Sequence, residues 1–207
     1  MNTLEPRAAL VATMRRLHTR GWAEGTGGNF SVVSSREPLR LLMAPSGVDK
    51  GLVEADALIE VDEGGQVLSG GGRASAEFLL HLAFVRARGA GAVLHTHSVT
   101  ATVLSLAALD AGSIHIGGLE MLKGLSGVTT HEHHEYIPVL PNTQDMGACA
   151  EMVAATLAAW PTAHAVLLAG HGLYTWGVDL AEAERHTQIL EFLLEVCWRQ
   201  RLLGSGR

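Results

Sequence analysis

The chain has 207 residues, of which 47% are hydrophobic and 17% charged, a composition that is typical of globular proteins and excludes a disordered one. Its formal net charge of −6 argues against a nucleic-acid-binding protein, and its longest apolar runs are too short to span a membrane. The N-terminus lacks a signal-peptide pattern, and Cys149 and Cys197 resemble small core residues of a reducing compartment, so we expect a cytoplasmic protein.

The first half of the chain predicts helices interleaved with strands. In order, we expect a helix over 6–20, a glycine-rich turn and strand in GTGGNFSVV, a strand in LRLLMAP, a hairpin in ALIEVDEGGQVLS and a helix over 75–88. Ser75 is placed to cap the last of these helices and Gly89 to end it.

The second half continues this alternation. After a strand around residue 94, we expect a helix over 98–109, strands in SIHIGG and EYIPVLP flanking a loop at 124–134, a helix over 145–159, strands in AVLLAGHG and LYTW, and a long helix from Asp179. No repeat or linker interrupts this order. The prediction is therefore one α/β domain over residues 1–207, with a mixed sheet covered by helices.

Two histidines stand two residues apart in the apolar stretch AVLHTHSV. Side chains alternate along a strand, so His95 and His97 should share one face while Thr96 points away. A lone histidine here would most often be a hydrogen-bonded core residue, whereas a same-face pair can share a metal ion.

The best third ligand is His171 in LLAGHG, at the end of an apolar strand and between two glycines that permit close approach. The alternative is a surface histidine in a glycine turn. Three imidazoles would leave coordination positions open for substrate, which is typical of a catalytic zinc or similar divalent ion that polarises a carbonyl.

Five motifs occur in an order that resembles the class II aldolase/adducin head-domain family. They are GTGGNFS, APSGVDKG, SAEFLLH, VLHTHS and GHGLYTWG, and the resemblance runs from about residue 8 to 203. It implies a single-domain three-layer αβα sandwich with a central mixed, largely antiparallel sheet. It also implies a homotetramer with sites at subunit interfaces and one divalent ion per subunit, for which we expect zinc.

Within the family, GLEMLKGL at 118–125 resembles the methylthioribulose-1-phosphate dehydratases, and PNTQD at 141–145 indicates the same group. The implied activity is that of a hydro-lyase of methionine salvage, which dehydrates 5-methylthioribulose 1-phosphate to 2,3-diketo-5-methylthiopentyl 1-phosphate. The alternatives are a class II sugar-phosphate aldolase or epimerase, or a non-catalytic interaction domain like the adducin heads.

The resemblance also implies roles for single residues. It assigns the metal to His95, His97 and His171, acid/base catalysis to Glu120, and the substrate phosphate to Gly28, Asn29, Ser46 and Gly47. Glu77 matches a carboxylate that binds metal in the aldolases, whereas some dehydratases have cysteine there. We place Glu77 among the substrate-binding residues and leave its role as a fourth ligand open.

The residues around Glu120 are mostly uncharged, so we expect partial burial to raise the pKa of its carboxyl toward neutrality. The alternative is an acid that stabilises the start of a helix. Lys50 and Lys123 either add positive charge to the site or are solvated or subunit-contact lysines.

Other histidines and aromatic residues are expected to be structural. HEHHE at 131–135 has ligand types that suit zinc, but we interpret it as a polar loop at the rim of the site. We expect Tyr174 and Trp176 to pack in the core, and the same structural role for His81, His115, His164 and His186.

Overall fold

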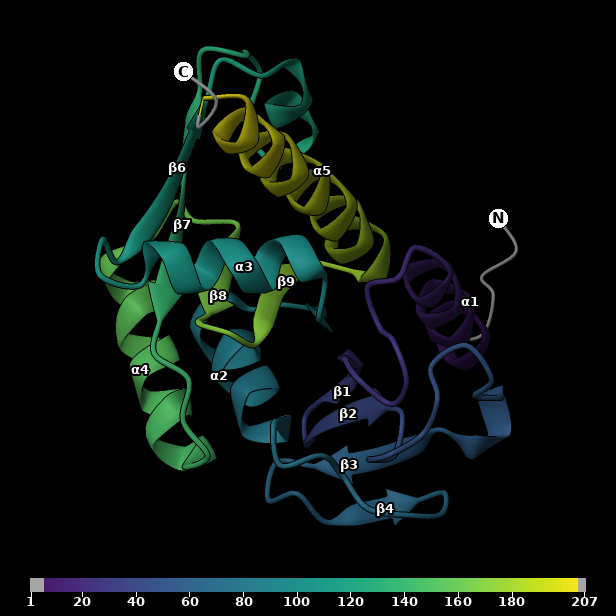
Figure 1. Cartoon of the computed structure of the whole chain (residues 1–207). Coiled ribbons are helices and arrows are strands. Elements are labelled where there is room, and N and C mark those ends of the chain that lie inside the picture. The colour runs from purple at the N-terminus through teal and green to yellow at the C-terminus, as the bar shows by residue number, and fades with distance from the viewer. Residues whose placement is uncertain (1–5, 205–207) are drawn as a thin grey trace.

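The apolar stretches fold into nine strands and five α-helices within residues 6–204, the range that the computed structural model describes (Figure 1). The helices are α1 (Pro6–Thr19), α2 (Phe78–Arg88), α3 (Val99–Ala108), α4 (Met146–Ala159) and α5 (Leu180–Gly204), with short 3-10 helices η1 (Ala55–Ala57) and η2 (Glu120–Gly124). The strands are β1 (Asn29–Arg36), β2 (Leu39–Met43), β3 (Ile59–Asp62), β4 (Val67–Ser69), β5 (Ala92–Thr96), β6 (Ser113–Gly117), β7 (His134–Leu140), β8 (Ala165–Leu168) and β9 (Gly172–Gly177).

All nine strands belong to one sheet, in the order β4-β3-β2-β1-β5-β9-β8-β7-β6. Neighbouring strands are antiparallel except for β7 and β8, which run parallel. This confirms the predicted mixed, largely antiparallel sheet. It also places β5 beside β9, so the strand that carries the histidine pair adjoins the strand that follows His171.

Side-chain alternation sends successive residues of each strand to opposite faces of the sheet. Leu41 and Met43 pack into one core with α2 and α4, whereas Leu42 packs on the other face with α1. The third core lies between the sheet, α3 and α5. These cores confirm the predicted helix–sheet–helix layers.

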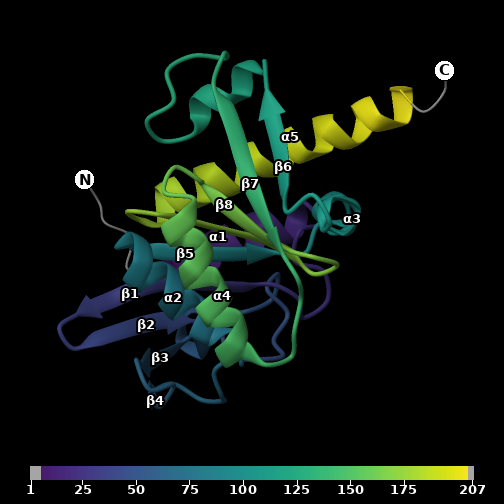
Figure 2. The same ribbon diagram turned by 90° about the vertical axis from the view of Figure 1, so that its left-hand side faces the viewer.

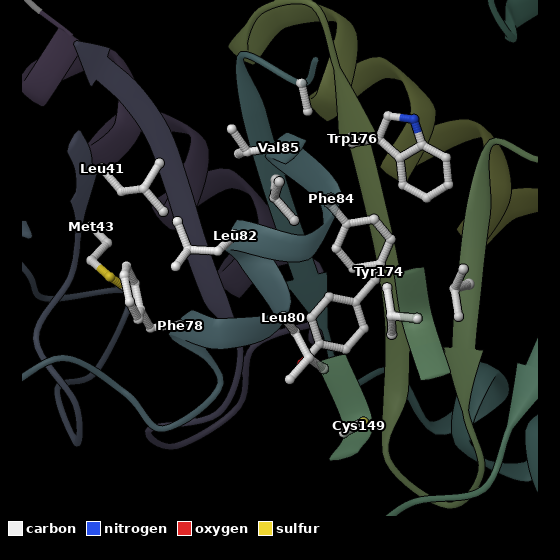
Figure 3. Packing of buried hydrophobic residues seen from close by; sticks show 14 of the residues in the cluster. Leu41, Met43, Phe78, Leu80, Leu82, Phe84, Val85, Cys149, Tyr174 and Trp176 are labelled. Carbon is white, nitrogen blue, oxygen red and sulfur yellow. The ribbon is translucent and has the colours of Figure 1, made fainter. Parts of the chain in front are cut away.

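One face of the sheet is anchored by aromatic packing (Figure 3). Phe84 of α2 stacks on both Tyr174 and Trp176 of β9, with ring centroids 5.5 and 5.0 Å apart. The prediction that Tyr174 and Trp176 are packing residues is therefore confirmed, although Tyr174 also contacts the site.

Two predicted boundaries were wrong. The helix predicted over 75–88 begins only at Phe78, because Ser75–Glu77 form a turn in which the Phe78 amide donates to the Ser75 carbonyl at 3.0 Å. Ser75 therefore does not cap the helix, and its hydroxyl accepts from the Glu77 amide instead. Likewise, the strand in AVLLAGHG ends at Leu168, so His171 lies in the turn between β8 and β9.

Strands β6 and β7 extend beyond the rest of the sheet, and the segment between them carries η2 (Figure 2). This segment is held to α5, where Arg185 donates to the Gly124 carbonyl at 3.0 Å. Both cysteines are free thiols. Among residues 6–204, no helix has the length and apolar character that crossing a membrane requires.

Candidate metal centre

His95 is fixed by its place in the sheet. It lies on β5, and its Nδ1 is 3.0 Å from the Leu173 carbonyl of the adjacent β9. A carbonyl can only accept, so Nδ1 carries the proton and Nε2 presents its lone pair. Thr96 points to the opposite face, where its hydroxyl donates to Glu191 at 2.6 Å.

The three predicted histidines converge. His95 Nε2 lies 2.7 Å from His97 Nε2 and 3.3 Å from His171 Nε2, and one nitrogen from each ring lies within 4.8 Å of the others. His97 follows the last residue of β5 rather than standing within the strand, but its ring returns to the same side as His95.

The chemistry of this donor set fits a divalent ion. Burial lowers the pKa of His95 and of His97, and in both cases the neighbouring His171 lowers it further, so the rings are neutral ligands at physiological pH. The Nδ1 atom of His171 is buried and has no hydrogen-bond partner among the described residues. Three imidazoles directed at one point are a donor set that suits a catalytic zinc or a similar divalent ion.

The three histidines can converge because β9 and the GTGGN loop both approach the backbone of β5 closely. A Cβ atom on Gly172 would lie 2.0 Å from the Thr96 carbonyl, so only glycine lets β9 approach β5 there. Gly28 has φ of +77°, and a Cβ on it would lie 2.9 Å from the His95 carbonyl. The GTGGN loop therefore packs directly against the histidine pair.

Glu77 joins the three histidines because it belongs to the turn before α2. One carboxylate oxygen lies 3.2 Å from His171 Nε2, and the other accepts from the Tyr174 hydroxyl at 3.2 Å and from the Asn29 side-chain amide. Burial raises the pKa of this carboxyl, but the hydrogen bond with His171, the electrostatic interactions with His95 and His171, and the hydrogen bond from Asn29 together hold it well below its usual range. Glu77 is thus a carboxylate placed beside the metal ligands.

A cavity of about 590 Å³ opens beside this cluster, and among the predicted site residues it is lined by Ser46, Glu77 and His171. It is also lined by Arg73, Asn142 and Gln144, which we did not assign as site residues from the sequence. Two features of the sequence could have indicated these residues: the arginine two positions before SAEF, and the polar side chains of PNTQD. Gly28 and Asn29 reach the site through the contacts described above, and Gly47 adjoins Ser46 with φ of +80°.

Glu120 does not join the cluster within the chain. It lies on η2 with its side chain 70% exposed, paired with Lys123 and 4.0 Å from His131. The expected burial was therefore wrong, because η2 lies on an exposed extension. The hydrogen bond from Lys123 lowers the pKa of Glu120, the opposite of the predicted shift.

The remaining histidines contact one another or the core rather than the three ligands. In HEHHE, His131 lies near Glu120, His133 contacts the buried Glu135 at 3.0 Å, and His134 contacts His115 at 2.7 Å. Among the described residues these contacts place HEHHE beside Glu120 and away from the three histidines of its own chain, so its position at the rim of a site stays a prediction. The structural roles of His81, His164 and His186 are confirmed by contacts with Ser31, Glu135 and the Trp176 carbonyl.

Lys50 is neither solvated nor a surface contact. Only 2% of it is exposed, and its ammonium donates to two backbone carbonyls, those of Thr26 at 3.0 Å and Val48 at 2.9 Å. Of the two alternatives for Lys50, a solvated or subunit-contact lysine is therefore excluded, because the two loops around it close over its side chain.

Comparison with known proteins identifies relatives over almost the whole length. Residues 8–198 match the model of the class II aldolase and adducin N-terminal domain. A methylthioribulose-1-phosphate dehydratase of Sodalis glossinidius is 41% identical over 199 residues, which cover 96% of this chain and 98% of that protein. A protein of the same name from Sorangium cellulosum is 40% identical over 91% of this chain and 89% of its own length.

Solved structures show the same fold. An L-fuculose-1-phosphate aldolase of Thermus thermophilus superposes with a TM-score of 0.75 at 28% identity, covering 96% of this chain and 98% of that one. YgbL of Escherichia coli, described as a putative aldolase/epimerase/decarboxylase, gives the same TM-score and identity over 93% and 87% of the two chains.

Proposed function

The chain belongs to the class II aldolase and adducin N-terminal domain family, and we propose that it is a hydro-lyase of methionine salvage that dehydrates 5-methylthioribulose 1-phosphate to 2,3-diketo-5-methylthiopentyl 1-phosphate. The observation that carries this proposal is the 40–41% identity to dehydratases of that name over at least nine-tenths of the chain. The convergence of His95, His97 and His171 supports an enzyme rather than a non-catalytic interaction domain.

We propose that these three histidines hold one divalent ion per subunit, with zinc as the expected ion. Imidazole ligands also accept iron and nickel, so the donor set favours a transition metal over magnesium or calcium. When bound, the ion supplies a Lewis acid that polarises the ketone of the substrate. Glu77 lies where it can complete the ligand set or orient the substrate hydroxyls.

The proton transfers are assigned to Glu120. Its carboxylate takes the proton from C3 of the substrate and then delivers it to the departing C4 hydroxyl, so that water leaves and the enol rearranges to the diketone. The ion pair with Lys123 favours the carboxylate form, which is the form that the first step needs.

Because Glu120 is exposed on the β6–β7 extension, we propose that it acts in the site of a neighbouring subunit. The enzyme would then be a homotetramer, working in the cytoplasm, in which each domain of residues 1–207 contributes ligands to one site and an acid/base to another. Burial at the subunit interface would raise the pKa of Glu120 toward the value that proton return to the leaving group requires.

The substrate phosphate is assigned to the loops at Gly28 and Asn29 and at Ser46 and Gly47. Backbone amides and hydroxyls are suitable donors for a phosphate. The Asn29 side-chain amide donates one N–H to Glu77, and its second N–H is the group that we assign to the phosphate.

A Glu120→Gln variant tests this assignment. We expect it to keep its metal, because Glu120 is not among the three histidine ligands or their contacts within the chain, and to lose activity by about 100-fold or more. Glu132→Gln, which changes another exposed carboxylate of the same segment, serves as the control and should retain activity. Full activity in Glu120→Gln would remove Glu120 from the mechanism.

A further inference from the structure

Lys50 is a buried cation without an ion pair. Its side chain is 2% exposed, and within residues 6–204 no carboxylate lies within salt-bridge distance of it. Lysine is almost never fully buried unless it is paired, because removing an ammonium from water is costly. The cost of burying this charge therefore requires a compensating role.

The two acceptors of Lys50 belong to two different loops. Thr26 lies in the GTGGN loop, which packs on the histidine pair, and Val48 follows Ser46 and Gly47 in the PSGV turn. These are the loops to which the proposed function assigns the phosphate. A single ammonium thus sets the distance between the two halves of the anion site.

The charge of Lys50 also reaches the site itself. Burial lowers the pKa of Lys50, while Asp49 and Glu77 oppose that effect. Burial and His171 lower the pKa of His97, and Lys50 adds to this lowering. An ammonium has three N–H donors, and two carbonyls accept from this one, so one donor remains for a further acceptor.

We propose that Lys50 is a positioning residue that determines the affinity of the enzyme for the phosphate group, by tying the GTGGN loop to the PSGV turn and by placing a buried positive charge behind both. This inference rests on the proposed function in one respect, the assignment of the phosphate to these loops. A phosphate dianion bound between them supplies the negative charge that Lys50 lacks within the chain.

The test compares Lys50→Met with Lys50→Gln in the metal-loaded, full-length protein. Both side chains are one bond shorter than lysine. Methionine keeps an apolar stem but removes every donor, whereas glutamine keeps two N–H donors without the charge. We expect Lys50→Met to weaken binding of inorganic phosphate, measured by titration calorimetry, and to raise KM, each by about tenfold. The kcat should change by less than about threefold, and the bound metal should stay the same, because Lys50 contacts neither the histidines nor the reacting carbons.

Lys50→Gln should weaken phosphate binding as well, because it lacks the positive charge although it retains N–H donors for the loop carbonyls. A loss in this variant therefore shows the contribution of the charge apart from that of the hydrogen bonds between the loops. Arg36→Met is the matched control, since Arg36 also ties backbone carbonyls, those of Gly89 and Ala90, but at the opposite end of β1. The proposal is overturned if both Lys50 variants bind phosphate like the wild type, or if Arg36→Met weakens binding equally. If Lys50→Met does not fold, the Lys50→Gln titration decides alone.

The two proposals fail in different ways. Phosphate titration needs no turnover, so it tests Lys50 even if the wild type leaves 5-methylthioribulose 1-phosphate unchanged. Conversely, wild-type dehydration together with unaltered phosphate binding in both variants rejects the role of Lys50 and leaves the dehydratase intact.

Discussion

At the scale of single residues, the chemistry of the site follows from what surrounds each polar atom. The Leu173 carbonyl fixes the proton of His95 on Nδ1, and Tyr174 stacks on the His95 ring with centroids 3.9 Å apart. The same tyrosine donates its hydroxyl to Glu77. One aromatic side chain therefore orients both a ligand and the carboxylate beside it.

Replacing Glu77 by glutamine tests the carboxylate beside the ligands. The change keeps the size of the side chain but removes the negative charge next to His95 and His171. We expect metal affinity to fall by about 10- to 100-fold, measured by competition with a chromogenic chelator. Glu151→Gln on the exposed face of α4 should leave it unchanged, and equal affinity in both variants would exclude Glu77 from the metal centre.

Glu191 makes the stability of the fold depend on pH. Burial raises the pKa of this carboxyl to about 7, against the hydrogen bonds from Ser98 and Thr96, which lower it. Because the folded state holds this proton more tightly than the unfolded state, stability is lost as pH rises from about 4.5 through about 7.

Glu191→Gln should remove that loss. We expect the free energy of unfolding of the wild type, relative to the variant, to fall by up to roughly 3 kcal/mol between pH 5 and pH 8. Urea unfolding at the two pH values measures the difference. Parallel pH profiles for the two proteins would show that Glu191 does not titrate in this range.

Several site residues were predictable from local pattern, and others were not. Strand alternation predicts the face of the sheet on which His95 lies, and the two glycines that flank His171 indicate it as the third metal ligand. In contrast, the burial of Lys50 depends on two loops closing over it, and the exposure of Glu120 depends on how far β6 and β7 extend. Neither is encoded within a short window of sequence.

At the scale of elements, short polar signals set where helices begin. Asp145 caps α4, where its carboxylate accepts from the Ala148 amide at 3.0 Å, and Ser98 caps α3. Ser75 carries the same kind of signal but belongs to a turn, so the start of α2 was misplaced by three residues. That turn is what brings Glu77 toward the histidines.

Removing the α4 cap should cost stability without affecting the site. We expect Asp145→Ala to lower the free energy of unfolding by about 1 kcal/mol, and Asp145→Asn to retain most of the wild-type stability. Metal content should be equal in all three proteins. A loss of metal in Asp145→Ala would mean that the N-terminus of α4, which adjoins the cavity at Gln144 and Met146, also shapes the metal centre.

At the scale of the whole molecule, the mixed sheet was predicted but the order of its strands was not. Short strands and turns were visible in the sequence, whereas the pairing of β5 with β9 joins residues almost eighty positions apart. The fold leaves Glu120 on one extension and the histidines near the centre of the sheet, which is why we propose that sites are completed between subunits.

Mixed oligomers test whether sites are shared. Glu120→Gln and His97→Ala subunits should each be inactive alone, and their co-expressed mixture should recover activity in about a quarter of its sites if Glu120 acts across an interface. If Glu120 acted within its own subunit, every site of the mixture would carry one defect. The mixture would then show no activity beyond that of the two variants.

The dehydratase activity is decided by the product that the metal-loaded protein forms from 5-methylthioribulose 1-phosphate, followed by NMR and mass spectrometry. We expect loss of one water molecule, with formation of the 2,3-diketone phosphate and no cleavage of the carbon chain. Cleavage between C3 and C4, inversion at a single carbon, or an unchanged substrate in a protein that has bound its metal would contradict this expectation.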